Sequence, residues 1–138
     1  MKSISKPLGK APSEIILSGA IIIKETNDEI PVSITIDTGS DNSHVDELLA
    51  GTYNLPIDKS ELRYTIVAGK KYPSFKTIVD LRVESKIILK NLELWTQPMG
   101  ELPDDVILGM TTLRNLNFSF HHKNGFCLFD VSTIPENE

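Results

Sequence analysis

One short segment of the sequence, residues 34–41 (Ile-Thr-Ile-Asp-Thr-Gly-Ser-Asp), combines side chains that could do acid–base chemistry. Asp37 follows an apolar stretch and is followed by a hydroxyl, a glycine and a second hydroxyl. This order suits a carboxylate that is held by hydrogen bonds and brought close to another backbone. Aspartates that activate water for hydrolysis work as a pair, and the chain has one copy of the segment. The segment therefore predicts a symmetric dimer in which each chain supplies one carboxylate.

The tripeptide Asp37-Thr38-Gly39 is a weak signal by itself, because Asp and Gly are also common in ordinary turns. Its surroundings favour chemistry. The apolar strand before it would make an unpartnered charge costly. A second unit of apolar residues and glycine, Ile107-Leu108-Gly109, follows later in the chain. Between the two units, the segment 62–83 predicts a hairpin whose Ala68-Gly69 tip could close over a groove.

The elements that must position these residues are mostly β-strands, indicated by alternation and by β-branched residues. Strands are expected at 14–17, 20–24, 31–36, 62–67, 76–83, 87–96, 106–108, 118–120 and 126–129. Asn42 or Ser43 is expected to cap a short helix through Leu49, and Thr111 or Thr112 another that ends near Asn117. Residues 1–13 are expected to form a flexible leader, 14–131 the domain, and 132–138 a polar tail.

Composition limits the possible functions. The 138 residues fit one domain, with 40% hydrophobic and 24% charged residues. The formal net charge is -5 and no basic block occurs, which argues against nucleic-acid binding. No apolar run is long enough to cross a bilayer, so no membrane partner is expected. Cys127 is the only cysteine, which suits a reducing compartment such as the cytoplasm.

The chain resembles the retropepsin-type aspartic proteases of retroviruses and LTR retrotransposons, whose relatives include the protease-like domain of DNA-damage-inducible proteins. The matching segments are 34–42, 67–69 and 106–109. The ending at 116–129 is closer to gypsy-type members than to the shorter retroviral enzymes. The resemblance implies an all-β, closed-barrel fold with one or two short helices, active as a homodimer.

The resemblance also implies an activity. Two Asp37 carboxylates would activate a water that hydrolyses an extended peptide, such as a viral or retrotransposon polyprotein, in the cytoplasm or in a virus-like particle. Neither a metal nor an organic cofactor is needed, because water is the nucleophile. An inactive dimerisation or peptide-binding module of the same fold is the alternative. A third hypothesis is an ordinary β-barrel domain with an accidental Asp-Thr-Gly turn.

Residue roles follow from the resemblance. Thr38 would hydrogen-bond across the dimer, Gly39 would allow close backbone approach, and Ser40 would donate to the outer oxygen of Asp37. These four residues form the expected catalytic set. The expected substrate-binding residues are Asp41, Asn42, Val67, Ala68, Gly69 and Ile107. Asp41 would accept a substrate N–H, Asn42 would lie at the pocket edge, and residues 67–69 would cover the peptide.

A few other residues have side chains that could take part in chemistry. His121, His122 and Cys127 could suggest a thiol nucleophile or a metal site, but adjacent histidines on a strand point to opposite faces, and Cys127 lies in an apolar pattern. Asp104-Asp105 could lie near the site, although a solvated turn is the favoured interpretation. Trp95 suits substrate contact and core packing equally.

Overall fold

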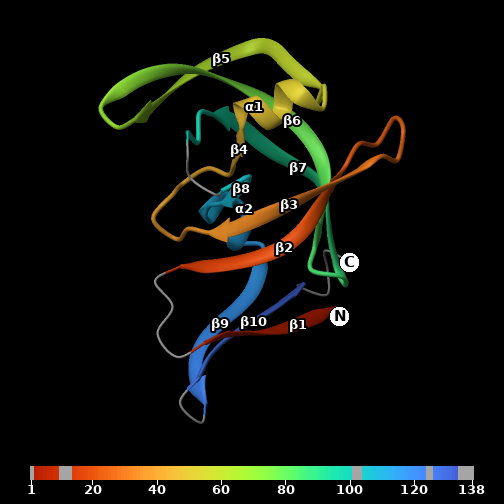
Figure 1. Cartoon of the computed structure of the whole chain (residues 1–138), viewed down its shortest axis with the longest axis vertical. Helices are drawn as coiled ribbons and strands as arrows, with labels where there is room; N and C mark the ends of the chain where they lie inside the picture. Colours follow the sequence, from red (N-terminus) through yellow and green to blue (C-terminus); the bar gives the residue numbers. More distant parts are fainter. Residues whose placement is uncertain (1, 10–13, 101–103, 124–125, 134–138) are drawn as a thin grey trace.

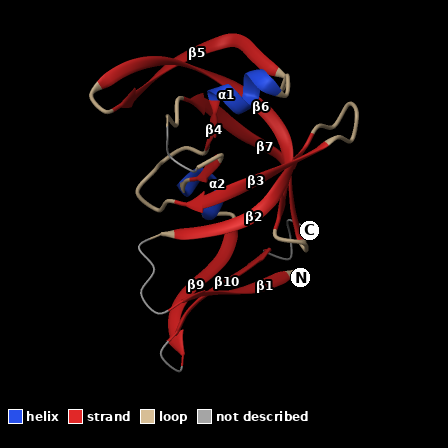
Figure 2. Ribbon diagram, in the orientation of Figure 1, coloured by secondary structure: helices blue, strands red, loops and turns tan. Residues whose placement is uncertain are grey.

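The computed structural model describes residues 2–9, 14–100, 104–123 and 126–133. Within them it has ten strands and two short helices, which confirms the expected mostly β fold (Figures 1 and 2). The elements are β1 (Ser3–Gly9), β2 (Ile15–Ile22), β3 (Glu29–Ile36), β4 (His44–Asp46), α1 (Glu47–Thr52), β5 (Ile57–Val67), β6 (Lys70–Val83), β7 (Ile87–Gln97), β8 (Val106–Leu108), α2 (Met110–Leu113), β9 (Leu116–Lys123) and β10 (Phe126–Thr133). In the described part of the chain, no helix is long and apolar enough to span a membrane.

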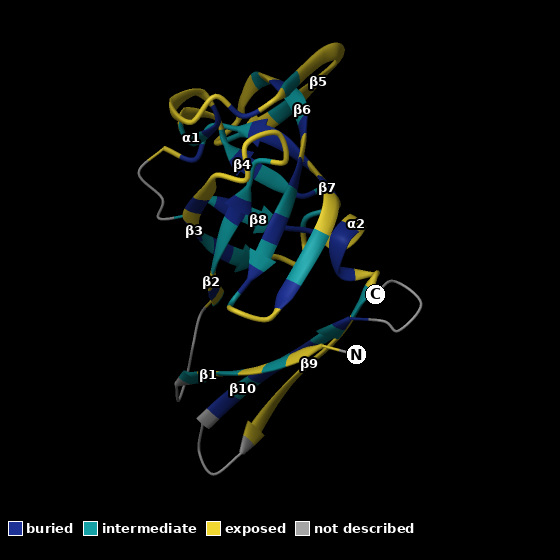
Figure 3. Cartoon of the chain, turned by 90° about the vertical axis from the view of Figure 1, so that its right-hand side faces the viewer, coloured by how far each residue is buried: buried dark blue, intermediate teal, exposed yellow. Residues whose placement is uncertain are grey.

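Six strands form a closed ring in the order β2-β3-β8-β4-β7-β6, and pairing of β2 with β6 closes it. Two of the contacts, β3 with β8 and β4 with β7, are parallel. The barrel interior is filled by alternating side chains such as Ile30, Val32 and Ile34 of β3, which are buried (Figure 3). The closed β-barrel predicted from the sequence is confirmed.

Closure of the ring depends on a glycine. Gly19 of β2 lies opposite Val83 of β6. A Cβ added to Gly19 would lie 2.1 Å from the carbonyl oxygen of Arg82 and 2.7 Å from Cδ1 of Ile34. Because only glycine permits this approach, β2 runs through Ser18-Gly19 as one strand, and the expectation of two strands at 14–17 and 20–24 was wrong.

The hairpin of β5 and β6 projects from the ring, because among the described strands β5 pairs in the sheet with β6 alone (Figure 1). Its tip is Ala68-Gly69, where both residues have positive φ, of 51° and 78°. Positive φ at both central residues is the geometry of a tight two-residue hairpin turn. The predicted hairpin is confirmed, with longer strands than expected. Along β5, Leu62, Tyr64 and Ile66 are exposed.

A second sheet, of order β1-β10-β9, lies below the ring in Figure 1. The flexible leader expected at 1–13 is wrong for residues 3–9, because they pair with β10 from Ser3–Ser132 onward. Ile4, Lys6 and Leu8 are half-buried and alternate with exposed residues. Residues 132 and 133 of the expected tail also belong to β10, while 134–138 lie outside the described residues.

Two helix predictions also need correction. Residues 44–46, expected to be helical, form β4, which is held between β7 and β8. Helix α1 therefore begins at Glu47, with Asp46 as N-cap accepting from the Leu48 N–H. Helix α2 begins at Met110 with Gly109 as N-cap, rather than at Thr111 or Thr112. The C-terminal hairpin is confirmed as β9 and β10, although its turn residues 124–125 lie outside the described residues.

Candidate active site

Asp37 lies where β3 leaves the ring. The parallel register of β3 and β8 places Ile36 opposite Leu108. The Asp37 N–H then donates to the Leu108 carbonyl at 3.0 Å, and the Asp37 carbonyl accepts from the Ser40 N–H at 3.2 Å. The first residue after the strand is therefore fixed by the second apolar unit, Ile107-Leu108-Gly109.

The carboxylate itself is exposed in the single chain and directed by its own loop. Its Oδ1 accepts from the Gly39 N–H at 2.9 Å. A Cβ added to Gly39 would lie 3.3 Å from the same oxygen, a tight contact. Within the chain, Gly39 thus leaves room for the Asp37 carboxylate. Thr38 is exposed beside it.

Gly109 supports the loop from behind. A Cβ there would lie 2.2 Å from the Asn42 carbonyl oxygen and 2.6 Å from that of Ser40. The next two N–H groups, of Met110 and Thr111, donate to the carbonyls of Ser40 and Asp41 at 2.8 and 2.9 Å. Helix α2 therefore holds the loop through backbone contacts that require glycine at its start.

The Ser40 hydroxyl differs from its expected role. Its Oγ donates to the carbonyl oxygen of Asn42 at 2.8 Å, within the loop. A hydroxyl has one proton to donate, so this bond replaces the expected donation to the outer oxygen of Asp37. Ser40 therefore shapes the loop that carries Asp41 and Asn42.

Ser43 is a structural residue that sequence reasoning proposed only as a helix cap. Its side chain is 1% exposed, and its Oγ accepts from the Gly109 N–H at 3.1 Å and lies 2.6 Å from Thr112 Oγ1. Its carbonyl accepts from the Trp95 N–H at 2.9 Å. One serine thus joins the Asp37 loop to β7 and α2. The residues around Ser43 form no apolar pattern that would have indicated this role from the sequence.

Asp37 lines a pocket of about 440 Å³ together with Ile107. Asp104 and Phe120 line the same pocket. Phe120 of β9 was not predicted at the site, because only the return of the C-terminal strands brings it there. The remaining lining residues are Glu14, Ile15, Thr35 and Ile36.

The acidic pair before β8 is not the solvated turn that the sequence favoured. The Thr35 hydroxyl donates to Asp104 Oδ1 at 2.5 Å. Asp105 Oδ2 accepts from the Ser33 N–H at 2.9 Å. Both carboxylates are half-buried against β3. They fix the strand that ends at Asp37, and Asp104 joins Asp37 and Glu14 as an acidic residue of the pocket.

The other predicted residues lie away from the pocket of Asp37. Asn42 is half-buried and lines a different pocket, between β7 and α2. Val67, Ala68 and Gly69 form the tip of the hairpin and do not line the Asp37 pocket in the described single chain. Trp95 is 3% exposed, so it packs in the core, and it also lines the pocket that contains Asn42.

The histidine and cysteine candidates lie on the second sheet. His122 Nδ1 is 3.3 Å from Cys127 Sγ, while His121 Nε2 is 3.5 Å from Asp130 Oδ2, so the two rings point to opposite faces as predicted. Cys127 is buried. Among the described residues, no group of three or more His, Cys, Asp or Glu side chains is arranged to hold a metal ion.

His44 is a titratable neighbour of Asp37. It lies on β4, opposite Trp95 of β7 and Ile107 of β8. Burial lowers the pKa of His44 below its ordinary value of 6.5, and the charge of Asp37 opposes this shift without cancelling it. The folded chain therefore holds His44 neutral more readily than the unfolded chain does.

We expect this shift to make stability depend on pH below about 6.5. Because the folded pKa of His44 is the lower one, the unfolded chain binds more protons there, and stability falls as the pH falls below the unfolded value. Urea unfolding at pH 7.5 and 5.5 checks this, since carboxylates with ordinary values near 4 contribute little in that range. His44→Gln should lose less stability between the two pH values than the unsubstituted protein. Equal losses would contradict the assignment.

The closed six-stranded ring, with an Asp-Thr-Gly loop bonded to an Ile-Leu-Gly unit, defines the class of retropepsin-like aspartic proteases. A family model described as aspartyl protease matches residues 23–112. The match covers most of the chain and both motifs, and the chain belongs to this aspartyl protease family.

Solved structures agree on the fold. The chain is similar to a retropepsin-like aspartic protease from Rickettsia conorii, with a TM-score of 0.56, 14% identity, and coverage of 96% of this chain and 97% of that one. It is also similar to the retroviral protease-like domain of Ddi1 from Leishmania major, with a TM-score of 0.51, 17% identity, and coverage of 89% and 97%. No curated protein matches the sequence.

Proposed function

We propose that this chain is one subunit of an aspartic endopeptidase and that the active enzyme is a homodimer with a single shared site. The observation that carries the proposal is an exposed Asp37 carboxylate on a loop fixed from β8 and α2. An exposed, rigidly held carboxylate can meet a second copy of itself across a two-fold axis. Thr38, which is exposed next to it, would bond to its counterpart there.

The proposed chemistry follows from the meeting of two like charges. Two close carboxylates cannot both ionise cheaply, so the pair shares one proton. The ionised member removes a proton from a bound water, whose oxygen attacks the peptide carbonyl. The protonated member stabilises the oxyanion and then donates its proton to the leaving nitrogen. The peptide C–N bond breaks, the water oxygen stays on the carbonyl carbon as part of the new carboxyl group, and the proton on nitrogen completes the new amine.

The proposed substrate is an extended peptide. The hairpin tip 67–69 would lie over it and pair with its main chain, as in strand addition. Ile107 would contact an apolar side chain beside the cut, and Asp41 would accept a substrate N–H. A viral or retrotransposon polyprotein, processed in the cytoplasm or a virus-like particle, is the natural substrate that we propose.

Dilution tests the shared site. Half-sites cannot react, so once the concentration falls well below the dimer dissociation constant, tenfold dilution should lower the rate per subunit about tenfold. Initial rates with a fluorogenic peptide, together with sedimentation of the same samples, measure this. A constant rate per subunit in samples that sediment as monomers would contradict the dimeric mechanism. A folded dimer without turnover would favour the inactive peptide-binding module.

A further inference from the structure

A pocket of about 740 Å³ lies between β7 and α2, and its lining does not include Asp37. Its lining includes Asn42, Arg63, Lys90, Glu93, Trp95 and Arg114. Three of them are cationic and one is anionic. The chain as a whole has a formal net charge of -5, whereas the charged residues that line this pocket have a net positive charge. Local charge of opposite sign favours anionic ligands.

The cations are available to a ligand. Among the described residues, neither Lys90 nor Arg114 forms an ion pair, and both are exposed. Arg63 Nη2 is 3.1 Å from Glu61 Oε1, but the two side chains are 50% and 46% exposed. An ion pair this exposed contributes little stability, so a ligand carboxylate can exchange with Glu61.

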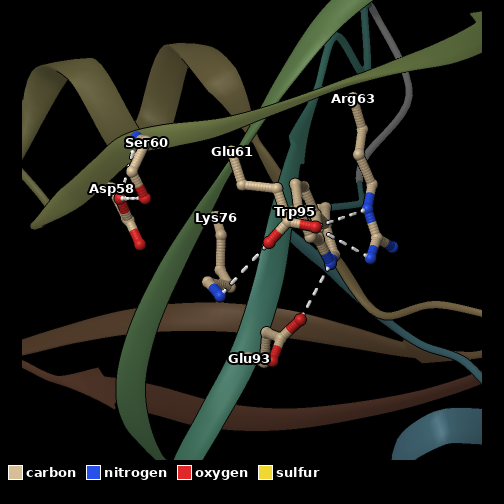
Figure 4. Close-up of polar contacts among 7 residues, drawn as sticks. All are labelled: Asp58, Ser60, Glu61, Arg63, Lys76, Glu93 and Trp95. Carbon is tan, nitrogen blue, oxygen red and sulfur yellow. Dashed lines mark hydrogen bonds and ion pairs between the residues drawn. The ribbon is translucent and has the colours of Figure 1, made fainter.

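Arg63 is held in place by an aromatic ring. Its guanidinium carbon lies 4.3 Å from the centroid of Trp95, and its Nη2 forms an ion pair with Glu61 (Figure 4). The Trp95 Nε1–H donates to Glu93 Oε1 at 3.2 Å, which occupies the one carboxylate of the pocket. The stacked guanidinium therefore presents a fixed charge at the wall of the pocket.

The pocket connects the two parts that the proposed function places around a peptide. Asn42 belongs to the Asp37 loop, where its carbonyl accepts from Ser40 Oγ. Arg63 belongs to β5, which ends at the hairpin tip. Thr65, two residues closer to the tip, donates to Gln97 Oε1 at 3.4 Å, so this face of β5 is turned toward the ring. The lining of the pocket thus includes one residue of the Asp37 loop and one of the strand that leads to the tip.

We propose that this pocket binds acidic side chains of the substrate that lie beyond the residues flanking the cut. The proposal rests on the proposed function and adds a substrate specificity to it. The preferred peptide has apolar residues next to the cleaved bond and Glu or Asp at positions farther from that bond. A two-fold symmetric dimer carries the pocket at both ends of its cleft. An acidic pair on either side of the cut therefore improves binding.

The test compares peptides with the same apolar centre. A Glu-Glu pair is moved from the second to the fifth position on either side of the cut, and each peptide has a Gln-Gln counterpart. Hydrolysis gives the Glu/Gln ratio of kcat/KM, and fluorescence anisotropy of reduced-amide versions gives the same ratio for Kd without turnover. We expect a preference for Glu of about tenfold in at least one position, falling as NaCl rises from 50 to 500 mM.

Variants locate the preference. Arg114→Gln and Lys90→Gln should each lower the Glu/Gln ratio about threefold, because each removes one facing charge. Lys59→Gln is the matched control, since Lys59 is exposed on β5 and does not line the pocket. It should leave the ratio unchanged. If the Glu/Gln ratio falls equally in the control, the preference depends on the net charge of the protein and not on the pocket, and the proposal is overturned.

The two readouts separate this inference from the proposed function. Hydrolysis without a Glu preference at any position overturns the pocket and leaves the endopeptidase intact. Glu-dependent binding of the reduced-amide peptides without hydrolysis supports the pocket and overturns the endopeptidase. If the protein neither hydrolyses nor binds the peptides, both proposals are overturned.

Discussion

Asp37→Asn should lower kcat/KM for peptide hydrolysis by about 10³-fold or more while leaving the protein folded. In a dimer the substitution replaces both carboxylates, so neither removal of a proton from water nor donation to the leaving nitrogen remains. The side chain is exposed, and the amide can keep the bond that Oδ1 accepts from the Gly39 N–H. We therefore expect thermal unfolding close to that of the unsubstituted chain. A fluorogenic peptide assay and a melting curve measure the two effects.

Asp28→Asn is the matched control, because Asp28 is exposed in the turn before β3, at the opposite end of that strand from Asp37. It should keep full turnover. Mixing Asp37→Asn with unsubstituted chains adds a second check, since a mixed dimer has one carboxylate. Activity should then fall more steeply than the fraction of unsubstituted chains. Retained turnover in Asp37→Asn alone would refute the mechanism.

Gly109→Ala should destabilise the fold by about 2–4 kcal/mol and remove activity with it. Its new Cβ would overlap the carbonyl oxygens of Asn42 and Ser40, at 2.2 and 2.6 Å. Both are backbone atoms, so the Asp37 loop or α2 must shift. The shift would strain the bond from Met110 N–H to Ser40 and move the loop that carries Asp37. Urea unfolding measures the free energy, and the peptide assay measures the activity.

Gly51→Ala is the matched control for this substitution. Gly51 lies in α1, and a Cβ there has no atom within 4 Å. Alanine in a helix should stabilise by about 0.5–1 kcal/mol relative to glycine. A Gly109→Ala protein with the same unfolding midpoint as Gly51→Ala would contradict the packing of the loop against α2.

The barrel strands and the Asp37 loop could be predicted because local signals carry them. Alternation marks β3, and the pairing of two motifs places Asp37 against β8. The misses depend on long-range contacts. β1 is polar and forms through pairing with β10 at the other end of the chain. The continuity of β2 depends on the Arg82 carbonyl, which Gly19 alone cannot reveal.

At the site, the sequence indicated residue types but not where side chains point. The Ser40 hydroxyl has several acceptors nearby, and only the loop shows that Asn42 is the one it uses. Three residues of the site come from separate parts of the chain and share no sequence pattern. Ser43 lies in a loop, Asp104 in a turn and Phe120 on a distant strand. Their roles follow from the closure of the ring and the return of β9.

The outer side of β5 has a consequence for handling the protein. Among the described strands β5 pairs with β6 alone, which leaves one row of its backbone N–H and C=O groups without a strand partner there. Leu62, Tyr64 and Ile66 of β5 are 48%, 57% and 74% exposed. Such a border can recruit another strand and seed aggregation. Concentrated samples are therefore expected to be most soluble when a bound peptide or a polar substitution at Ile66 protects that border.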